Sequence, residues 1–234
     1  MIESVNNERV IKYSKLNNKK YRDQEGLFIV EGDHLVEEAS KYAEVVEIFT
    51  TGDYANATKV SVPVMKKISG LDNPPKVLAI VKKLEEKSIN GNVIILDDIQ
   101  DPGNLGTIIR SAVAFNIDTI ILSNNSVDLY NTKTIRASEG MMFKVNIIRT
   151  DLESIINKLK DNYDIITTDV VSGIELSELK VNTPYAIIMG NEGNGVSENI
   201  SKLANKKLNI KMNKACESLN VGVATSIILY ELNK

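Results

Sequence analysis

The stretch VIILDDIQDPGNLGTIIRSAVAFNIDTIILS, residues 93–123, decides the fold class of the larger part of this chain. It opens with the apolar run VIIL, passes through a polar turn at Pro102-Gly103, and continues with helically spaced apolar residues to a second apolar run, TIIL. Short β-branched runs are typical of buried strands, and a helix between two of them indicates a crossover between parallel strands. Residues 93–123 therefore predict a β-α-β unit.

The same alternation continues to the end of the sequence. We expect further strands and helices in turn: strands at 145–148, 163–169, 185–190 and 207–210, and helices at 151–161, 196–203 and 218–232. Strands that alternate with helices favour a mostly parallel, doubly wound sheet. The pattern therefore predicts an α/β fold for residues 93–234.

A smaller α/β pattern occupies residues 1–83. Its expected helices are 3–17, 33–41 and 63–70, and its expected strands are 27–32, 45–50 and 77–82. Residues 84–92 are polar and turn-rich, which is typical of a linker. The sequence thus predicts two domains, 1–83 and 93–234, joined by a linker at 84–92.

Composition limits the possible functions. The 234 residues are 43% hydrophobic and 25% charged, which is ordinary for a soluble globular protein, and no apolar run approaches the roughly 20 residues of a membrane span. Without an apolar signal-peptide core at its start, the chain is expected in the cytoplasm. Cys216 is the only cysteine, so no intrachain disulfide or cysteine-based zinc site is possible. His34 is the only histidine, and we expect it in a surface or capping role.

The charge distribution leaves nucleic-acid binding to a local patch. The net charge is −3, whereas nucleic-acid-binding proteins usually carry a basic footprint. The first 22 residues hold a basic cluster set against only Glu3 and Glu8; its members are Arg9, Lys12, Lys15, Lys19, Lys20 and Arg22. This cluster is either an RNA-binding patch or the solvated face of a helix.

Ligands of open α/β sheets bind in loops beyond the carboxyl ends of the strands. One such loop lies in the segment 97–110, which runs into a helix. Asn104 in this segment is either the cap of that helix or a functional residue. Arg110, six residues further on, is either a surface ion-pair partner or a functional residue.

Two later stretches are also unusual. Residues 189–197 hold three glycines, which let the backbone approach a ligand closely, and Glu192 there is either a ribose-binding carboxylate or a turn residue. No dinucleotide fingerprint or P-loop occurs, which argues against a nicotinamide-dependent dehydrogenase. In residues 210–231, Ser218 or Asn220 can cap a final helix so apolar that it belongs in a core or a subunit interface.

Together these stretches resemble the three motifs of the SpoU (TrmH) family of RNA 2′-O-ribose methyltransferases, in the SPOUT class. The similar segments occur in the family's order: LDDIQDPGNLGTIIRSAVAFN (96–116), IIMGNEGNGVS (187–197) and IKMNKACESLNVGVATSIILYE (210–231). RASEGMMF (136–143) resembles an intermediate segment of the family, and KYRDQEGLFIVEGDHLVEEA (20–39) is similar to its L30e-like substrate-binding domain.

The resemblance implies properties that periodicity does not show. It implies a trefoil knot in the C-terminal domain, S-adenosylmethionine as cofactor, and a homodimer with the knot region at the interface. We expect no metal, since the sequence offers no cluster of histidines and cysteines and methyl transfer needs no Lewis acid, and the absence of a long apolar run predicts no membrane association. It also implies methylation of a ribose 2′-hydroxyl in structured RNA, with 23S ribosomal RNA favoured over tRNA. A non-catalytic RNA-binding module is the remaining alternative, against which intact motif residues argue.

The resemblance also assigns roles to residues. Asn104 and Arg110 match the family's active-site asparagine and arginine, Glu192 its second-motif acid, and Ser218 and Asn220 polar positions of the third motif. The expected cofactor-binding residues are Gly190, Ile210, Met212 and Leu219. The sequence departs from the family at Lys211, where proline is common, at residues 213–216, which lack the usual glycines, and at Gly222, in place of a small polar residue.

An arginine in this site has a restricted chemistry. Because its guanidinium is effectively always protonated, we expect Arg110 to bind an RNA phosphate and stabilise developing alkoxide charge rather than to accept a proton. A phosphate oxygen or water would accept the proton, and Asn104 would orient Arg110 or the ribose.

Overall fold

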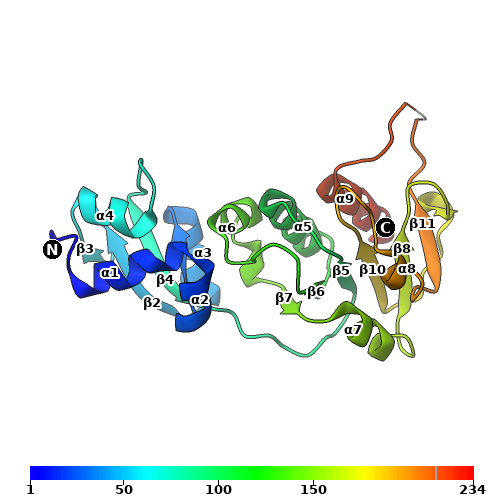
Figure 1. The fold of residues 1–234 in the computed structure, drawn as a ribbon, viewed down its shortest axis with the longest axis horizontal. Helices are drawn as coiled ribbons and strands as arrows, with labels where there is room; N and C mark the ends of the chain where they lie inside the picture. The colour runs from blue at the N-terminus through cyan, green and yellow to red at the C-terminus, as the bar shows by residue number, and fades with distance from the viewer. Residues whose placement is uncertain (214) are drawn as a thin grey trace. The chain divides into compact units, whose positions relative to one another are not determined.

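The computed structural model describes residues 1–213 and 215–234, and its internal contacts divide the chain into two units (Figure 1). Unit 1 comprises residues 1–85 and 128–143, and unit 2 comprises residues 86–127 and 144–234. The segment 128–143, which lies far along the sequence, thus packs with the N-terminal residues.

Unit 1 is built on a four-stranded sheet with the order β1-β4-β2-β3. Its strands are β1 (Leu27–Glu31), β2 (Val45–Thr50), β3 (Thr58–Lys59) and β4 (Val77–Lys82). β4 runs antiparallel to both β1 and β2, and β3 is parallel to β2. The helices are α1 (Glu8–Ser14), η1 (Lys15–Asn17), α2 (Lys19–Glu25), α3 (Asp33–Tyr42), α4 (Val62–Ser69), α6 (Thr132–Ser138) and η2 (Met141–Phe143).

The N-terminal helix differs from the expected span 3–17. It begins at Glu8 because the side chain of Asn7 accepts a hydrogen bond from the Arg9 N–H, as an N-cap does. Asn18 caps a second helix, α2, in the same way, and Gly26 ends it with a positive φ of 64°. Asn7 therefore shortens the expected helix at its start, and Asn18 begins a further helix that the sequence pattern did not predict.

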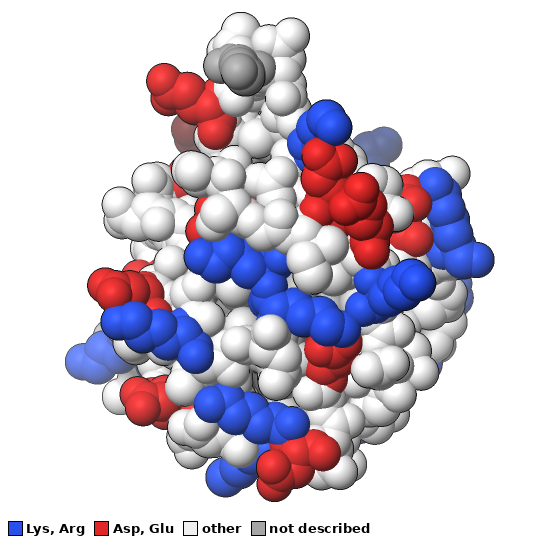
Figure 2. All heavy atoms as spheres, turned by 90° about the vertical axis from the view of Figure 1, so that its right-hand side faces the viewer, with Lys and Arg blue, Asp and Glu red and all other residues white. Residues whose placement is uncertain are grey.

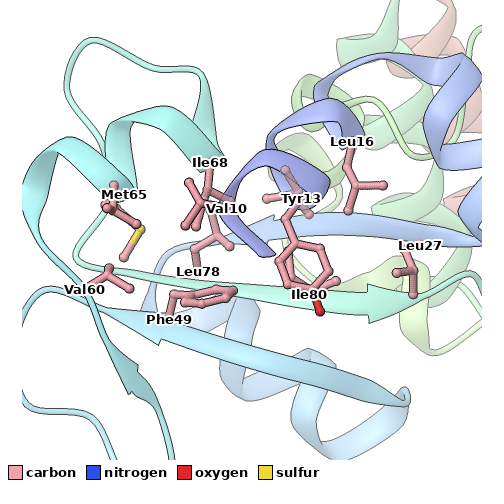
Figure 3. Packing of buried hydrophobic residues seen from close by; sticks show 12 residues of the cluster. Val10, Tyr13, Leu16, Leu27, Phe49, Val60, Met65, Ile68, Leu78 and Ile80 are labelled. Carbon is pink, nitrogen blue, oxygen red and sulfur yellow. The ribbon is translucent and has the colours of Figure 1, made fainter. Parts of the chain in front are cut away.

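The core of unit 1 lies between its sheet and the helices α1 and α4. Figure 3 shows Val10 of α1 beside Ile68 of α4, and Tyr13 of α1 directed toward Ile80 of the sheet. Tyr13 meets Phe49 edge to face, with ring centroids 5.8 Å apart. Burial of these apolar side chains is the main force that holds the helices on the sheet.

The segment 128–143 is held in unit 1 by charge and by aromatic packing. The Arg22 guanidinium donates to Asp128 Oδ2 from Nη2 at 2.6 Å and from Nε at 3.2 Å. The ring of Phe28 packs against Tyr130 and Phe143, with centroids 4.6 and 6.5 Å apart. A buried ion pair and an aromatic cluster thus fix the segment to β1 and α2.

Unit 2 is built on a seven-stranded sheet with the order β7-β6-β5-β10-β8-β11-β9. Its strands are β5 (Val93–Leu96), β6 (Thr119–Leu122), β7 (Asn146–Arg149), β8 (Asp164–Thr168), β9 (Ile174–Glu175), β10 (Tyr185–Met189) and β11 (Lys206–Asn209). Its helices are α5 (Pro102–Ala114), α7 (Leu152–Leu159), η3 (Leu176–Glu178), α8 (Glu198–Ser201) and α9 (Val221–Leu232). Every strand pair in this sheet is parallel.

Both faces of the central strands are buried, as a doubly wound sheet requires. Val93 and Ile95 of β5 belong to a cluster with Ile156 of α7, while Ile94 and Leu96, which point to the opposite face, are also fully buried. The predicted α/β class with a parallel sheet is confirmed. The trefoil knot remains a prediction. Within the part of the chain that is described, no helix is long and apolar enough to cross a membrane.

Candidate active site

A cavity of about 450 Å³ lies at the carboxyl ends of the central strands of unit 2. Thr168 ends β8 and Met189 ends β10, and both line the cavity. The loop 190–196, the segment after β11 and the α9 residues Val221, Ala224 and Ile228 also line it. The cavity therefore occupies the position at which open parallel sheets bind ligands.

The residues expected to bind the cofactor all line this cavity. They are Gly190, Ile210, Met212 and Leu219. Glu192 and Ser218, which the sequence places in the active site, also line it. Residues separated by up to 29 positions, from Gly190 to Leu219, thus surround a single space.

The glycine loop needs its glycines because its backbone folds closely on itself. A Cβ atom on Gly190 would lie 2.0 Å from the carbonyl carbon of Gly195, a separation that no side chain tolerates. Asn191 and Gly195 exchange two backbone hydrogen bonds of 2.9 Å, and Gly195 has a positive φ of 68°. A larger residue at position 190 would therefore force the loop open.

Three of the expected polar residues, Asn220, Asn104 and Glu192, are linked in a row by hydrogen bonds, here called the polar chain. Asn104 Nδ2 donates to Glu192 Oε1 at 2.9 Å, and Asn104 Oδ1 accepts from Asn220 Nδ2 at 2.8 Å. Asn220 also accepts from the N–H groups of Gly222 and Val223, and so caps α9. The chain links residues from all three sequence motifs.

Asn104 is not the cap of α5, the simpler of its two interpretations. Asp101 is the cap, and its carboxylate accepts a hydrogen bond of 2.9 Å from the Asn104 N–H. The amide side chain of Asn104 is thereby left to contact Glu192 and Asn220. Of the two candidate caps of α9, Asn220 rather than Ser218 is the one observed.

Arg110 is not part of the polar chain of Asn220, Asn104 and Glu192. It is exposed on α5 and does not line the cavity. Among residues 1–213 and 215–234, it has no ion pair and no hydrogen-bond partner for its guanidinium, so the surface ion pair considered for it is absent there. Within the described residues of one polypeptide chain, Arg110 therefore neither lines the cavity nor forms a hydrogen bond with the other expected residues.

Comparison with known proteins identifies the family. A family model described as the SpoU rRNA Methylase family matches residues 91–230, and one described as an MRM3-like substrate binding domain matches residues 7–79. The chain belongs to the SpoU rRNA methylase family. The resemblance stated from the three motifs is confirmed.

Individual SpoU relatives match nearly the whole chain. The 23S rRNA (guanosine(2553)-2′-O)-methyltransferase RlmP of Bacillus subtilis is 32% identical, over 99% of this chain and 98% of its own length. The crystal structure of an AdoMet-bound rRNA methyltransferase from Sinorhizobium meliloti superposes with a TM-score of 0.87 at 26% identity, covering 98% of this chain and 95% of that one. A putative TrmH-family RNA methyltransferase from Porphyromonas gingivalis gives a TM-score of 0.86 at 26% identity, covering 97% and 98%.

The structure shows what Lys211 and Gly222, two of the departures from the SpoU pattern, contact. Lys211 forms an ion pair of 2.9 Å with Glu175. A Cβ on Gly222 would lie 3.1 Å from Thr107 Cγ2, so glycine there allows α9 to approach α5 closely. Within residues 213–216, Lys214 lies outside the described residues.

Sequence reasoning missed one side of the SpoU cavity, the segment after β8. Thr168, Asp169, Val170 and Val171 line the cavity there. Burial acts to raise the pKa of Asp169, but hydrogen bonds from the Val171 N–H at 2.7 Å and from Lys207 at 3.0 Å outweigh it, and the pKa lies below its ordinary value. Residues 168–171 lie at the carboxyl end of a predicted strand, and this position was the signal from which they could have been predicted.

The basic cluster expected in the first 22 residues is only in part a free surface. Arg22 is buried, and it donates to Asp128 and to the backbone carbonyls of Leu16 and Asn17. Three more members are neutralised by carboxylates in the pairs Arg9–Glu47, Lys12–Glu25 and Lys19–Asp23. Arg22 is thus removed from the surface of the cluster, whereas the paired side chains of Arg9, Lys12 and Lys19 stay 52%, 52% and 62% exposed. Both interpretations of the cluster remain predictions.

Proposed function

We propose that this chain transfers a methyl group from S-adenosylmethionine to a ribose 2′-hydroxyl of 23S ribosomal RNA. The observation that carries the proposal is the similarity, over both units, to a methyltransferase named for that reaction on 23S rRNA. Methylation of tRNA is the second candidate, since some related proteins are named as tRNA/rRNA methyltransferases. Ribosomal RNA is favoured because the N-terminal match extends through a substrate-binding domain.

The cavity suits S-adenosylmethionine in size and chemistry. Ligand sites of drug-sized molecules are typically about 300–1,000 Å³ and mostly apolar, with a few polar groups. Ile210, Leu219 and Ile228 supply apolar surface for an adenine ring, and the loop 190–196 brings backbone groups close to a ligand. When bound, the cofactor supplies an electrophilic methyl group on a sulfonium.

The chain's own residues then position the RNA. Arg110, with no partner among the described residues, is available for a bidentate contact with a phosphate next to the target ribose. There it stabilises negative charge as the 2′-hydroxyl loses its proton to a phosphate oxygen or water. The Asn220–Asn104–Glu192 chain holds the polar wall of the site in one orientation.

A homodimer accords with the exposed surface of α9. Val223, Ile227 and Tyr230 are 47%, 39% and 57% exposed although apolar. Their spacing places them on one face of the helix, and apolar stripes of this kind mark interfaces. We therefore propose that two copies associate through α9, and that the enzyme works in the cytoplasm on ribosomal RNA.

RNA recognition is assigned to unit 1. The match to a substrate-binding domain at residues 7–79 supports this assignment. On the face of unit 2 seen in Figure 2, Lys and Arg side chains lie next to Asp and Glu side chains. Lys206 and Lys207 of β11 are paired with Asp164 and Asp169, so their charge is largely neutralised.

A methylation assay on defined RNA tests the proposal. The purified chain would be incubated with S-adenosylmethionine and, separately, with unmodified 23S rRNA and unmodified tRNA. We expect a 2′-O-methylated nucleotide in the 23S rRNA, located by mass spectrometry of nuclease fragments. Modification of tRNA alone would favour the second candidate. Cofactor binding without methylation of either RNA would contradict both.

A further inference from the structure

Asp97 joins the end of β5 to both ends of the glycine loop. Its backbone N–H donates to the carbonyl of Met189, the last residue of β10, at 2.9 Å. Its carboxylate oxygen Oδ2 accepts two hydrogen bonds from Ser197, one from the backbone N–H at 2.8 Å and one from the hydroxyl at 2.7 Å. Residues 190–196 all line the cavity. The residues on either side of them, Met189 and Ser197, are therefore both hydrogen-bonded to Asp97.

The environment of Asp97 makes these bonds strong. Asp97 is only 8% exposed, and hydrogen bonds to an ionised carboxylate are shorter and stronger than bonds between neutral groups. Ser197 stands at the N-cap position of α8, yet its hydroxyl makes no capping hydrogen bond, because it is turned toward Asp97 instead. The helix α8 therefore lacks a side-chain cap, and the Ser197 hydroxyl holds the end of the glycine loop instead.

Asp98, the residue after Asp97, also holds the glycine loop. Asn191 Nδ2 donates to the backbone carbonyl of Asp98 at 2.8 Å, and Asn191 Oδ1 accepts from the Gly193 N–H at 2.8 Å. Glu192, between them, reaches Asn104. Fixing the loop on β5 therefore fixes both the cavity wall and the polar chain.

We propose that Asp97 is a positioning residue that holds the glycine loop in its cofactor-binding shape before the cofactor arrives. Asp97 does not line the cavity, so it acts on the cofactor site through Ser197. A loop that is already ordered does not lose conformational freedom on binding, and this raises affinity. The inference rests on the proposed function, since it takes S-adenosylmethionine as the ligand of the cavity.

Cofactor affinity and turnover, measured on the full chain, test this role. In Asp97→Asn the amide oxygen still accepts a hydrogen bond but the charge is lost, and in Ser197→Ala only the hydroxyl bond is lost. We expect Asp97→Asn to weaken S-adenosylhomocysteine binding in calorimetry about tenfold, the equivalent of 1.4 kcal/mol. The KM for S-adenosylmethionine should rise in parallel, while kcat at saturation stays within a few fold. Ser197→Ala should give a smaller change in the same direction.

Asp164→Asn is the matched control. Asp164 is also a buried carboxylate of this sheet, with a side chain 8% exposed, but it starts β8 at the opposite edge, where it binds Lys206 and the Asn182 N–H. It should lower the melting temperature without changing cofactor affinity. Equal weakening by Asp164→Asn, or unchanged affinity in a folded Asp97→Asn, would overturn the inference. If the unaltered chain binds no S-adenosylmethionine, the proposed function itself fails.

Discussion

Asn104 and Glu192, 88 positions apart in the sequence, are joined by a hydrogen bond of 2.9 Å between the amide nitrogen and a carboxylate oxygen. The bond connects the start of α5 to the glycine loop after β10. Because Asn104 also accepts from Asn220, its amide has a fixed orientation, with the nitrogen toward the acid and the oxygen toward the start of α9.

Replacement of Asn104 by alanine should reduce kcat/KM about tenfold to a hundredfold, the loss expected for hydrogen bonds that include a charged partner. α5 itself should persist, because the bond from Asp101 is to the backbone N–H of residue 104, which alanine retains. Steady-state methylation kinetics and circular dichroism check the two expectations. Glu192→Gln, whose amide oxygen still accepts from Asn104, should lose less; a greater loss would mean that the charge of Glu192 has a role beyond this bond.

Arg110→Ala should remove methylation and leave cofactor affinity within a few fold, because Arg110 does not line the cavity. Arg110→Lys should also be poor, since a single ammonium cannot replace the bidentate guanidinium on a phosphate. Single-turnover methylation and calorimetry with S-adenosylhomocysteine separate the two effects. Near-normal turnover by the lysine variant would refute the proposed phosphate contact.

Arg22→Ala should destabilise unit 1 by about 3 kcal/mol, because it leaves the largely buried carboxylate of Asp128 without its charged partner. The two side chains are 7% and 14% exposed. On the same helix, Lys19 pairs with Asp23 at the surface, where the side chains are 62% and 46% exposed, so Lys19→Ala should cost less than ~0.5 kcal/mol. Urea unfolding of both variants measures the difference. Similar midpoints would mean that the segment 128–143 is held by its aromatic contacts alone.

If the proposed dimer forms through α9, Ile227→Asp should convert it to a monomer, because a charge would interrupt the apolar stripe on that helix. Val62→Asp is the control, since Val62 is an exposed apolar residue of α4 in unit 1, 59% exposed. Sedimentation velocity distinguishes the species. A monomeric unaltered chain, or a dimer that survives the substitution at Ile227, would argue against association through this face.

Charge reversal at Lys15 and Lys20 should weaken RNA binding and flatten its dependence on salt, by a slope of about one for each phosphate that the variant no longer binds. These are the two members of the N-terminal basic cluster that are not paired with a carboxylate among the described residues; Lys15 lies over the ring of Tyr21. Filter binding over a range of salt concentrations measures the slope. Reversal of Lys202, which pairs with Glu198 in unit 2, is the control and should change the slope little.

The sequence alone was enough to predict the fold class, the family and most of the cavity, although not its side at residues 168–171. Buried parallel strands are nearly continuous apolar runs, and their carboxyl ends must meet at one edge of the sheet, so the loops after residues 96 and 189 could be placed together before any coordinates. The three glycines of residues 189–197 predicted a close approach of the backbone to a ligand, and the structure adds that Gly190 packs against the backbone of Gly195.

The partner that each polar group takes became visible only in the folded structure. Asp101, not Asn104, caps α5, and Arg22 is buried against Asp128 rather than displayed to a ligand. The two bonds from Asp97 to Ser197 and the attachment of residues 128–143 to unit 1 are equally invisible in the pattern of apolar and polar residues. The physical reason is that apolar burial follows a local periodicity, whereas hydrogen bonds and ion pairs depend on distances of a few ångströms between segments that only folding brings together.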